Sequence, residues 1–221
     1  MNYLTHKLLN SEELEILRKN LGKDDLFWED GKKTAGQQAA KVKNNLQLRR
    51  DSDLSLKLSG LITKKILCNE LIKSFALPKK VHGTIFSKTM SGMKYGRHID
   101  NAYMSSGRAD LSFTIFLNPK NNYEGGALSI EDFNSEEKFK LDAGEIIIYP
   151  STYLHSVGEV FVGERLVFIG WIESYVKSIE DREYLFDLDA AARSLLAKYG
   201  RSDEVDLIFK SYSNLLRRLG S

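Results

Sequence analysis

The chain has 221 residues, 42% of them hydrophobic, which suffices for one substantial core with a small appended subdomain but not for two full domains. Its 32 basic residues nearly cancel its 30 acidic residues, and a net charge of +2 gives no reason to expect nucleic acid or an anionic membrane as a partner. A neutral partner or a small anion is the ligand class that remains.

No stretch has the length of a signal peptide or the roughly 20 consecutive apolar residues of a membrane span. The single cysteine, Cys68, cannot form a disulfide within the chain, and no cluster of cysteine and histidine with zinc spacing surrounds it. We therefore expect a soluble cytoplasmic protein that does not associate with a membrane.

The first 80 residues mix helical and extended patterns. Asn10 with Glu13 predicts a capped helix start, and Gly22 predicts the end of the same helix. Residues 42–48 alternate between polar and apolar, which predicts a first strand, whereas the apolar spacing over residues 54–75 predicts a helix that lies on a sheet.

The middle of the chain consists of short apolar or alternating runs separated by turn residues, which predicts strands. The runs are residues 83–90, 94–100, 111–117, 127–130, 138–141, 145–149, 155–160 and 165–172. This spacing is typical of a β-sandwich or jelly roll. After residue 175 the period becomes helical again and predicts two helices that pack on each other and on the barrel.

The expected fold is therefore mainly β with flanking helices. Its core is a double-stranded β-helix (jelly roll), with N-terminal helices before it and a C-terminal helical extension after it. The predicted division has three parts. They are residues 1–80, with helices and first strands that pack on the barrel, residues 81–175 as the jelly-roll core, and residues 176–221 as a helical subdomain.

A histidine and a carboxylate two residues apart are the first candidate metal ligands. If His98 and Asp100 share a strand, their side chains point to the same face while Ile99 faces the core. His155, which follows the apolar run 145–149 after a short turn, is the natural third ligand. Two histidines and one carboxylate form the facial triad of non-haem iron(II) oxygenases, which leaves coordination positions open for other ligands.

Arg165 begins the very hydrophobic run of residues 165–172. A buried arginine needs an anion, and a dicarboxylate co-substrate supplies one through paired hydrogen bonds. Each residue taken alone also has a structural explanation, such as an ion pair of Arg165 with Glu145 or Glu159. It is the combination of the four residues in an eight-strand pattern that indicates chemistry, whereas His6 and His82 are interpreted as ordinary histidines.

Two motifs carry a family resemblance. They are Tyr95-Gly-Arg-His98-Ile-Asp100-Asn-Ala102 and Tyr149-Pro-Ser-Thr-Tyr-Leu-His155-Ser-Val157. Here the sequence resembles the PKHD-type hydroxylases, which are Fe(II)- and 2-oxoglutarate-dependent dioxygenases related to prolyl 4-hydroxylase. Similar segments near residues 30–48, 125–128 and 212–218 extend the resemblance over nearly the whole chain.

The resemblance implies roles for particular residues. His98, Asp100 and His155 would bind Fe(II) as the catalytic centre, and Arg165 and Tyr95 would bind 2-oxoglutarate. The enzyme would use O2 to hydroxylate a small-molecule or peptidyl substrate that no motif identifies, and would release succinate and CO2. The resemblance further implies ascorbate (vitamin C) as an additional cofactor and a link to iron homeostasis.

The sequence leaves three alternatives open. The same ligands could hold zinc or manganese in a cupin-like isomerase or hydrolase, or the barrel could be a non-enzymatic module that senses a metal or a small acid. The C-terminal helices could form a homodimer interface instead of packing on their own chain. Proximity to the metal motifs also suggests a set of substrate contacts, namely Asn45, Gln47, Asn101, Tyr103 and Trp171.

Overall fold

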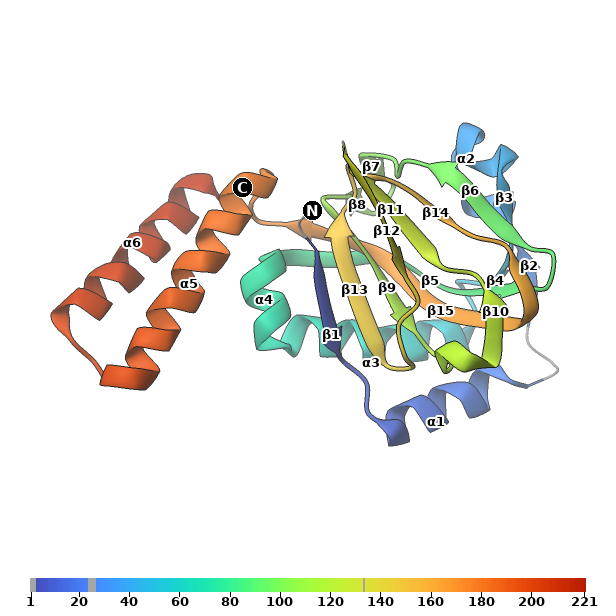
Figure 1. The fold of residues 1–221 in the computed structure, drawn as a ribbon, viewed down its shortest axis with the longest axis horizontal. Helices are drawn as coiled ribbons and strands as arrows, with labels where there is room; N and C mark the ends of the chain where they lie inside the picture. The colour runs from blue at the N-terminus through green and yellow to red at the C-terminus, as the bar shows by residue number, and fades with distance from the viewer. Residues whose placement is uncertain (1–2, 24–26, 133) are drawn as a thin grey trace.

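The computed structural model describes residues 3–23, 27–132 and 134–221. Within these residues two antiparallel sheets form the body of the protein, helices cover one side of it, and a helical hairpin extends from one end (Figure 1). The expected class, mainly β with flanking helices around a jelly-roll core, is confirmed.

The larger sheet contains both long strands of the protein. Its strands are β1 (Leu4–Lys7), β2 (Trp28–Asp30), β4 (Leu46–Leu48), β5 (Pro78–Met90), β9 (Leu111–Phe116), β10 (Tyr123–Gly125), β13 (Glu145–Pro150) and β15 (Val160–Ser174). They follow the order β1-β13-β9-β15-β5-β4-β2, with β10 paired to β15 off this path.

The smaller sheet carries the two predicted metal motifs. Its strands are β3 (Lys43–Asn44), β6 (Lys94–His98), β11 (Leu128–Asp132), β12 (Ser135–Phe139) and β14 (Leu154–Val157), in the order β12-β11-β14-β6-β3. Two short strands, β7 (Tyr103–Met104) and β8 (Gly107–Arg108), pair with each other as a separate hairpin.

The helices are mostly N-terminal or C-terminal to the sheets. They are α1 (Ser11–Leu21), the 3-10 turn η1 (Gly31–Thr34), α2 (Gln37–Lys41), α3 (Asp53–Cys68), α4 (Glu70–Ala76), the 3-10 turn η2 (Lys120–Asn122), α5 (Ile179–Tyr199) and α6 (Asp203–Leu219). The capping box predicted at Asn10 and Glu13 is present at the start of α1.

Strand alternation separates two hydrophobic layers. In β13, Ile146 and Ile148 join the core that α1, α3 and α4 cover, whereas Ile147 and Tyr149 join the core between the sheets. Successive side chains of a strand point to opposite faces, and both faces of this strand are covered, which explains a run of consecutive buried residues. The same alternation turns one face of β5, β9 and β15 towards the space between the sheets.

The predicted boundaries are wrong in two places of the N-terminal part. The predicted helix 54–75 is interrupted at Asn69, whose side chain accepts a hydrogen bond from the Ile72 backbone and so starts α4 as a new helix. The predicted strand 42–48 divides into β3 and β4, which pair with β6 and β5 in different sheets.

The C-terminal helices α5 and α6 pack against each other as expected. Leu185 of α5 lies in a small apolar cluster with Leu77 and Val176, and Leu216 and Leu219 of α6 pack against this cluster. Figure 1 shows the hairpin extending away from the sheets. Dimerisation through these helices stays a prediction, as does the division at residues 80 and 175.

No helix in the part of the chain that the structure describes is both long and apolar enough to cross a membrane.

Candidate functional site

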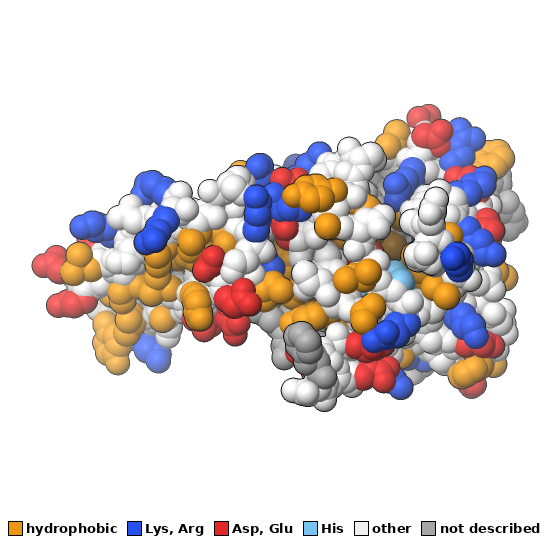
Figure 2. Space-filling view, turned by 90° about the horizontal axis from the view of Figure 1, so that it is seen from above, with side chains coloured by type: hydrophobic (Ala, Val, Ile, Leu, Met, Phe, Trp, Pro, Cys, Tyr) orange, Lys and Arg blue, Asp and Glu red, His pale blue; other side chains and the backbone are white. Residues whose placement is uncertain are grey.

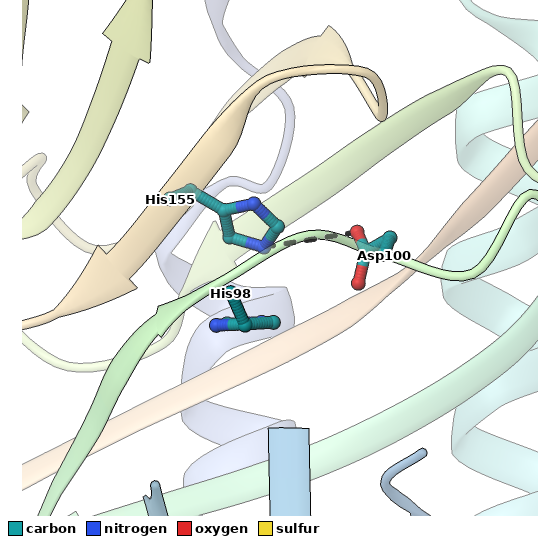
Figure 3. Close-up of side chains that lie close together, drawn as sticks. All are labelled: His98, Asp100 and His155. Atoms are coloured by element: carbon teal, nitrogen blue, oxygen red, sulfur yellow. Dashed lines mark ion pairs between the residues drawn. The ribbon is translucent and has the colours of Figure 1, made fainter. Parts of the chain in front are cut away.

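Two neighbouring strands of the smaller sheet bring His98 and His155 together. His98 is the last residue of β6 and pairs directly with His155 of β14. Directly opposite residues of an antiparallel pair point to the same face, and here the centroids of the two imidazole rings are 4.3 Å apart. Figure 3 shows the ring of His155 turned towards the Asp100 carboxylate and the ring of His98 close by.

Asp100 reaches the histidines from a loop and not from a strand. The strand predicted over residues 94–100 ends at His98, so the expected strand geometry does not apply to Asp100. The prediction that Ile99 faces the core is wrong, because Ile99 is 53% exposed. The turn after β6 instead directs the Asp100 carboxylate to within 3.7 Å of His155 Nε2, and one ligand atom from each of the three residues lies within 4.8 Å of the others.

Backbone carbonyls orient both imidazoles. His98 Nδ1 lies 2.8 Å from the Gly96 carbonyl oxygen, and His155 Nδ1 lies 3.1 Å from that of Tyr153. A carbonyl only accepts hydrogen bonds, so each Nδ1 carries a hydrogen, and Nε2 is the nitrogen of each ring that could bind a metal. Burial, together with the nearby His155 ring, lowers the pKa of His98, which favours the neutral form that a metal requires.

The Asp100 carboxylate is held by two donors on one of its oxygens. Oδ2 accepts hydrogen bonds from the Ser112 hydroxyl at 2.6 Å and from the Trp171 indole nitrogen at 2.9 Å. The same oxygen lies 3.7 Å from His155 Nε2, so these donors fix the carboxylate beside the imidazole. Two imidazoles and one anchored carboxylate therefore fit a ferrous ion, and they match the donor set of non-haem iron oxygenases.

The three residues line a pocket between the sheets with a volume of about 310 Å³. Figure 2 shows a histidine side chain inside a hollow of the surface over this part of the molecule. Tyr95 lines the pocket and stacks on the His98 ring with centroids 3.6 Å apart. Burial raises the pKa of the Tyr95 hydroxyl, so that it remains protonated and able to donate a hydrogen bond.

Arg165 lines the same pocket as a buried cation without an anionic partner. It is 2% exposed, and neither Nε nor Nη2 of its guanidinium has a hydrogen-bond partner. The alternative ion pairs with Glu145 and Glu159 do not form among the described residues. A buried guanidinium with free donors that face a cavity fits a bound carboxylate, so this residue fits the distal end of 2-oxoglutarate.

The pocket also tests the proposed substrate contacts. Asn45, Asn101, Tyr103 and Trp171 line it, whereas Gln47 does not. His82 is an ordinary buried histidine as expected, because its ring nitrogens lie within hydrogen-bond distance of Ser106 Oγ and the Arg108 carbonyl.

Sequence reasoning did not identify Ser112, Tyr149 and Lys43 as pocket residues. For Ser112 a local signal exists, because Ser112 and Thr114 alternate with large apolar residues in β9 and so mark the face that lines the pocket. Lys43 offers no such signal, since its strand is only two residues long.

Comparison with known proteins identifies the family of this chain. Residues 84–173 match the model of the 2OG-Fe(II) oxygenase superfamily, and residues 180–220 match that of the PKHD-type hydroxylase C-terminal domain. A PKHD-type hydroxylase of Prochlorococcus marinus strain MIT 9215 is 76% identical over 220 residues, and one of strain MIT 9211 is 57% identical over 220 residues. Both alignments cover 100% of each chain.

Solved structures share the fold at low sequence identity. A prolyl-4-hydroxylase from Pseudomonas putida superimposes with a TM-score of 0.55 and 16% identity over 78% of this chain and 92% of its own. A prolyl hydroxylase from Trichoplax adhaerens, solved with a peptide fragment, superimposes with a TM-score of 0.56 and 15% identity over 83% of this chain and 86% of its own.

Family membership excludes the non-enzymatic and cupin-like alternatives, since an oxygenase of this superfamily uses Fe(II), 2-oxoglutarate and O2. With full-length relatives at 76% identity, the chain belongs to the PKHD-type hydroxylases and is a 2-oxoglutarate- and Fe(II)-dependent dioxygenase.

Proposed function

We propose that His98, Asp100 and His155 bind the catalytic Fe(II), and that Arg165 and Tyr95 bind 2-oxoglutarate beside it. The observation that carries this assignment is the shared pocket. Two imidazoles and a carboxylate converge in it, and a buried guanidinium with unsatisfied donors lines it as well. The reaction is the hydroxylation of a substrate that enters the same pocket, with release of succinate and CO2.

The metal and the protein side chains have different roles in this site. Bound Fe(II) supplies the redox chemistry through which O2 and 2-oxoglutarate oxidise a substrate C–H bond. The protein side chains orient the reactants: Arg165 holds one carboxylate of the co-substrate, and the Tyr95 hydroxyl donates a hydrogen bond to it. The apolar side chains between the sheets exclude water from the reaction.

Anaerobic addition of Fe(II) and 2-oxoglutarate to the protein, followed by a pulse of O2, tests this function. We expect a weak visible charge-transfer band before the pulse and succinate after it. A protein that binds both components but releases no succinate, with or without added substrate candidates, would contradict the assignment.

We propose that Ser112 and Trp171 position Asp100 for the metal. Changing Ser112→Ala or Trp171→Phe removes one hydrogen bond to Oδ2 and lets the carboxylate rotate, so Fe(II) affinity should fall about 10- to 100-fold. Fe(II) titration measures this change directly. Trp28→Phe is the matched control, because Trp28 lies under Lys88 and not in the pocket. Unchanged iron affinity in Trp171→Phe would contradict the role.

Two further roles that the family resemblance suggests stay predictions. Ascorbate should sustain turnover by keeping the iron reduced, which repeated-turnover assays with and without ascorbate would reveal. A link to iron homeostasis would appear as altered expression of the protein when iron is limiting.

A further inference from the structure

Lys43 is a second buried cation in the pocket, separate from Arg165. It is 5% exposed, and its ammonium forms no ion pair with a carboxylate of the described residues. Its contacts are a long hydrogen bond of 3.4 Å to the Thr34 hydroxyl and the face of the Tyr95 ring, whose centroid is 4.9 Å away. Burial lowers the pKa of Lys43 to about 8, although the Asp100 and Asp30 carboxylates act in the opposite direction.

Arg50 also lines the pocket, but its side chain is exposed. Among the described residues it forms no ion pair with an acidic side chain, and its guanidinium donates a hydrogen bond of 3.4 Å to the Gly83 carbonyl. The preceding Arg49 differs, because its guanidinium pairs with Asp51 at 2.6 Å. The positive charge of Arg50 further lowers the pKa of Lys43, so an anion bound near both side chains would relieve their repulsion.

When Fe(II) and 2-oxoglutarate are bound, the pocket would contain no anion that balances Lys43 and Arg50. Asp100 is the one acidic residue among the described residues that line the pocket, and the basic ones are Lys43, Arg50 and Arg165. With both components bound, the positive charges of Fe(II) and Arg165 are balanced by the Asp100 carboxylate and the two carboxylates of 2-oxoglutarate. Lys43 and Arg50 therefore remain for a further anion.

We propose that Lys43 and Arg50 form the substrate subsite, and that the hydroxylated substrate is a small molecule with a carboxylate or phosphate group. This inference rests on the proposed function of the same pocket. A cavity of about 310 Å³ is at the small end of ligand pockets and must also hold the co-substrate, which favours a small molecule over a peptide segment. Lys43 lies against Tyr95, which stacks on His98, so the anionic group is held beside the metal.

Calorimetric titration of the protein loaded anaerobically with Fe(II) and 2-oxoglutarate tests the subsite without turnover. The probes are N-acetyl-L-alanine, its uncharged amide and 2-hydroxyethyl phosphate. We expect at least one charged probe to bind about tenfold or more tightly than the amide, and the stronger of the two charged probes identifies the group. Equal binding of the amide, or no saturable binding of either charged probe below about 10 mM, would overturn the proposal.

Variants assign the binding to the two side chains. Lys43→Met and Arg50→Gln should each weaken the charged probe about tenfold, whereas Lys43→Arg should retain its binding. The matched controls are Lys41→Met and Arg49→Gln, whose exposed side chains contact Gln38 and Asp51 outside the pocket. If a control variant loses as much affinity for the charged probe as its paired variant, only the general surface charge is involved.

The two proposals fail in different ways. If the wild type fails to bind 2-oxoglutarate, the proposed function is wrong. If it binds 2-oxoglutarate normally but Lys43→Met weakens that binding, Lys43 is a co-substrate anchor and the substrate subsite is wrong.

Discussion

Replacing Arg165 with methionine is expected to abolish tight binding of 2-oxoglutarate and to leave Fe(II) binding nearly intact. Removing one partner of a buried, hydrogen-bonded charge pair costs about 2–5 kcal/mol, so the dissociation constant for 2-oxoglutarate should rise roughly 30- to 5,000-fold. Methionine has a similar length and fills the same space. Calorimetric titration of the iron-loaded protein with 2-oxoglutarate measures the change.

The free energy of unfolding of Arg165→Met without 2-oxoglutarate should equal or exceed that of the wild type. The Arg165 guanidinium is buried with two unsatisfied nitrogens, and replacing a poorly paired buried charge with an apolar group is neutral or stabilising by about 1–4 kcal/mol. Adding 2-oxoglutarate should raise the melting temperature of the wild type through linkage, but not that of Arg165→Met.

Arg182→Met is the matched control for a buried arginine. Arg182 is 4% exposed, but its guanidinium donates hydrogen bonds to the carbonyls of Val176 and Lys177, outside the pocket. Its loss should therefore destabilise the protein while 2-oxoglutarate affinity stays unchanged. If Arg165→Met and Arg182→Met destabilise the protein equally and neither changes 2-oxoglutarate affinity, Arg165 is a structural residue.

Changing Asp100→Ala is expected to remove both iron binding and succinate production. Losing a partner outside the coordination sphere typically costs 10- to 100-fold in metal affinity, so loss of the proposed carboxylate ligand should exceed about 100-fold. Fe(II) titration and a succinate assay under saturating 2-oxoglutarate measure the two effects separately.

Asp142→Ala controls for the loss of a carboxylate elsewhere. Asp142 is exposed and pairs with Lys120 at 2.9 Å, so this variant should bind iron and turn over 2-oxoglutarate like the wild type. Retention of iron affinity within a few-fold in Asp100→Ala would contradict the assignment of this residue to the metal.

Local pattern was sufficient to predict most elements of the fold. The cap at Asn10, most strands from β5 onward and the helical C-terminus depend on periodicity and on turn residues that lie close together in the chain, whereas the short strands β1, β2 and β10 were not predicted. The same reasoning identified His98, Asp100, His155 and Arg165, because imidazole, carboxylate and guanidinium groups are rare in apolar strands without a partner.

Local pattern failed where the outcome depended on contacts between distant segments. Residues 42–48 divide because two different sheets accept their backbone hydrogen bonds. The Asn69 side chain caps a new helix locally and also lies 3.1 Å from the His6 ring, 63 residues away in the chain. The orientation of Asp100 is of the same kind, since Ser112 and Trp171 on the other sheet hold its carboxylate after β6 has ended.

The sequence by itself determined the class of fold, the family and the identity of the candidate metal and co-substrate residues, because these depend on residue type and spacing. Only the tertiary structure revealed that Lys43 and Arg50 share a pocket with them. Lys43 reaches it through the pairing of β3 with β6, and a pairing between segments some fifty residues apart leaves no trace in the local pattern of either strand. The positive charges of Lys43 and Arg50 that are proposed to bind the substrate therefore come together only in the folded protein.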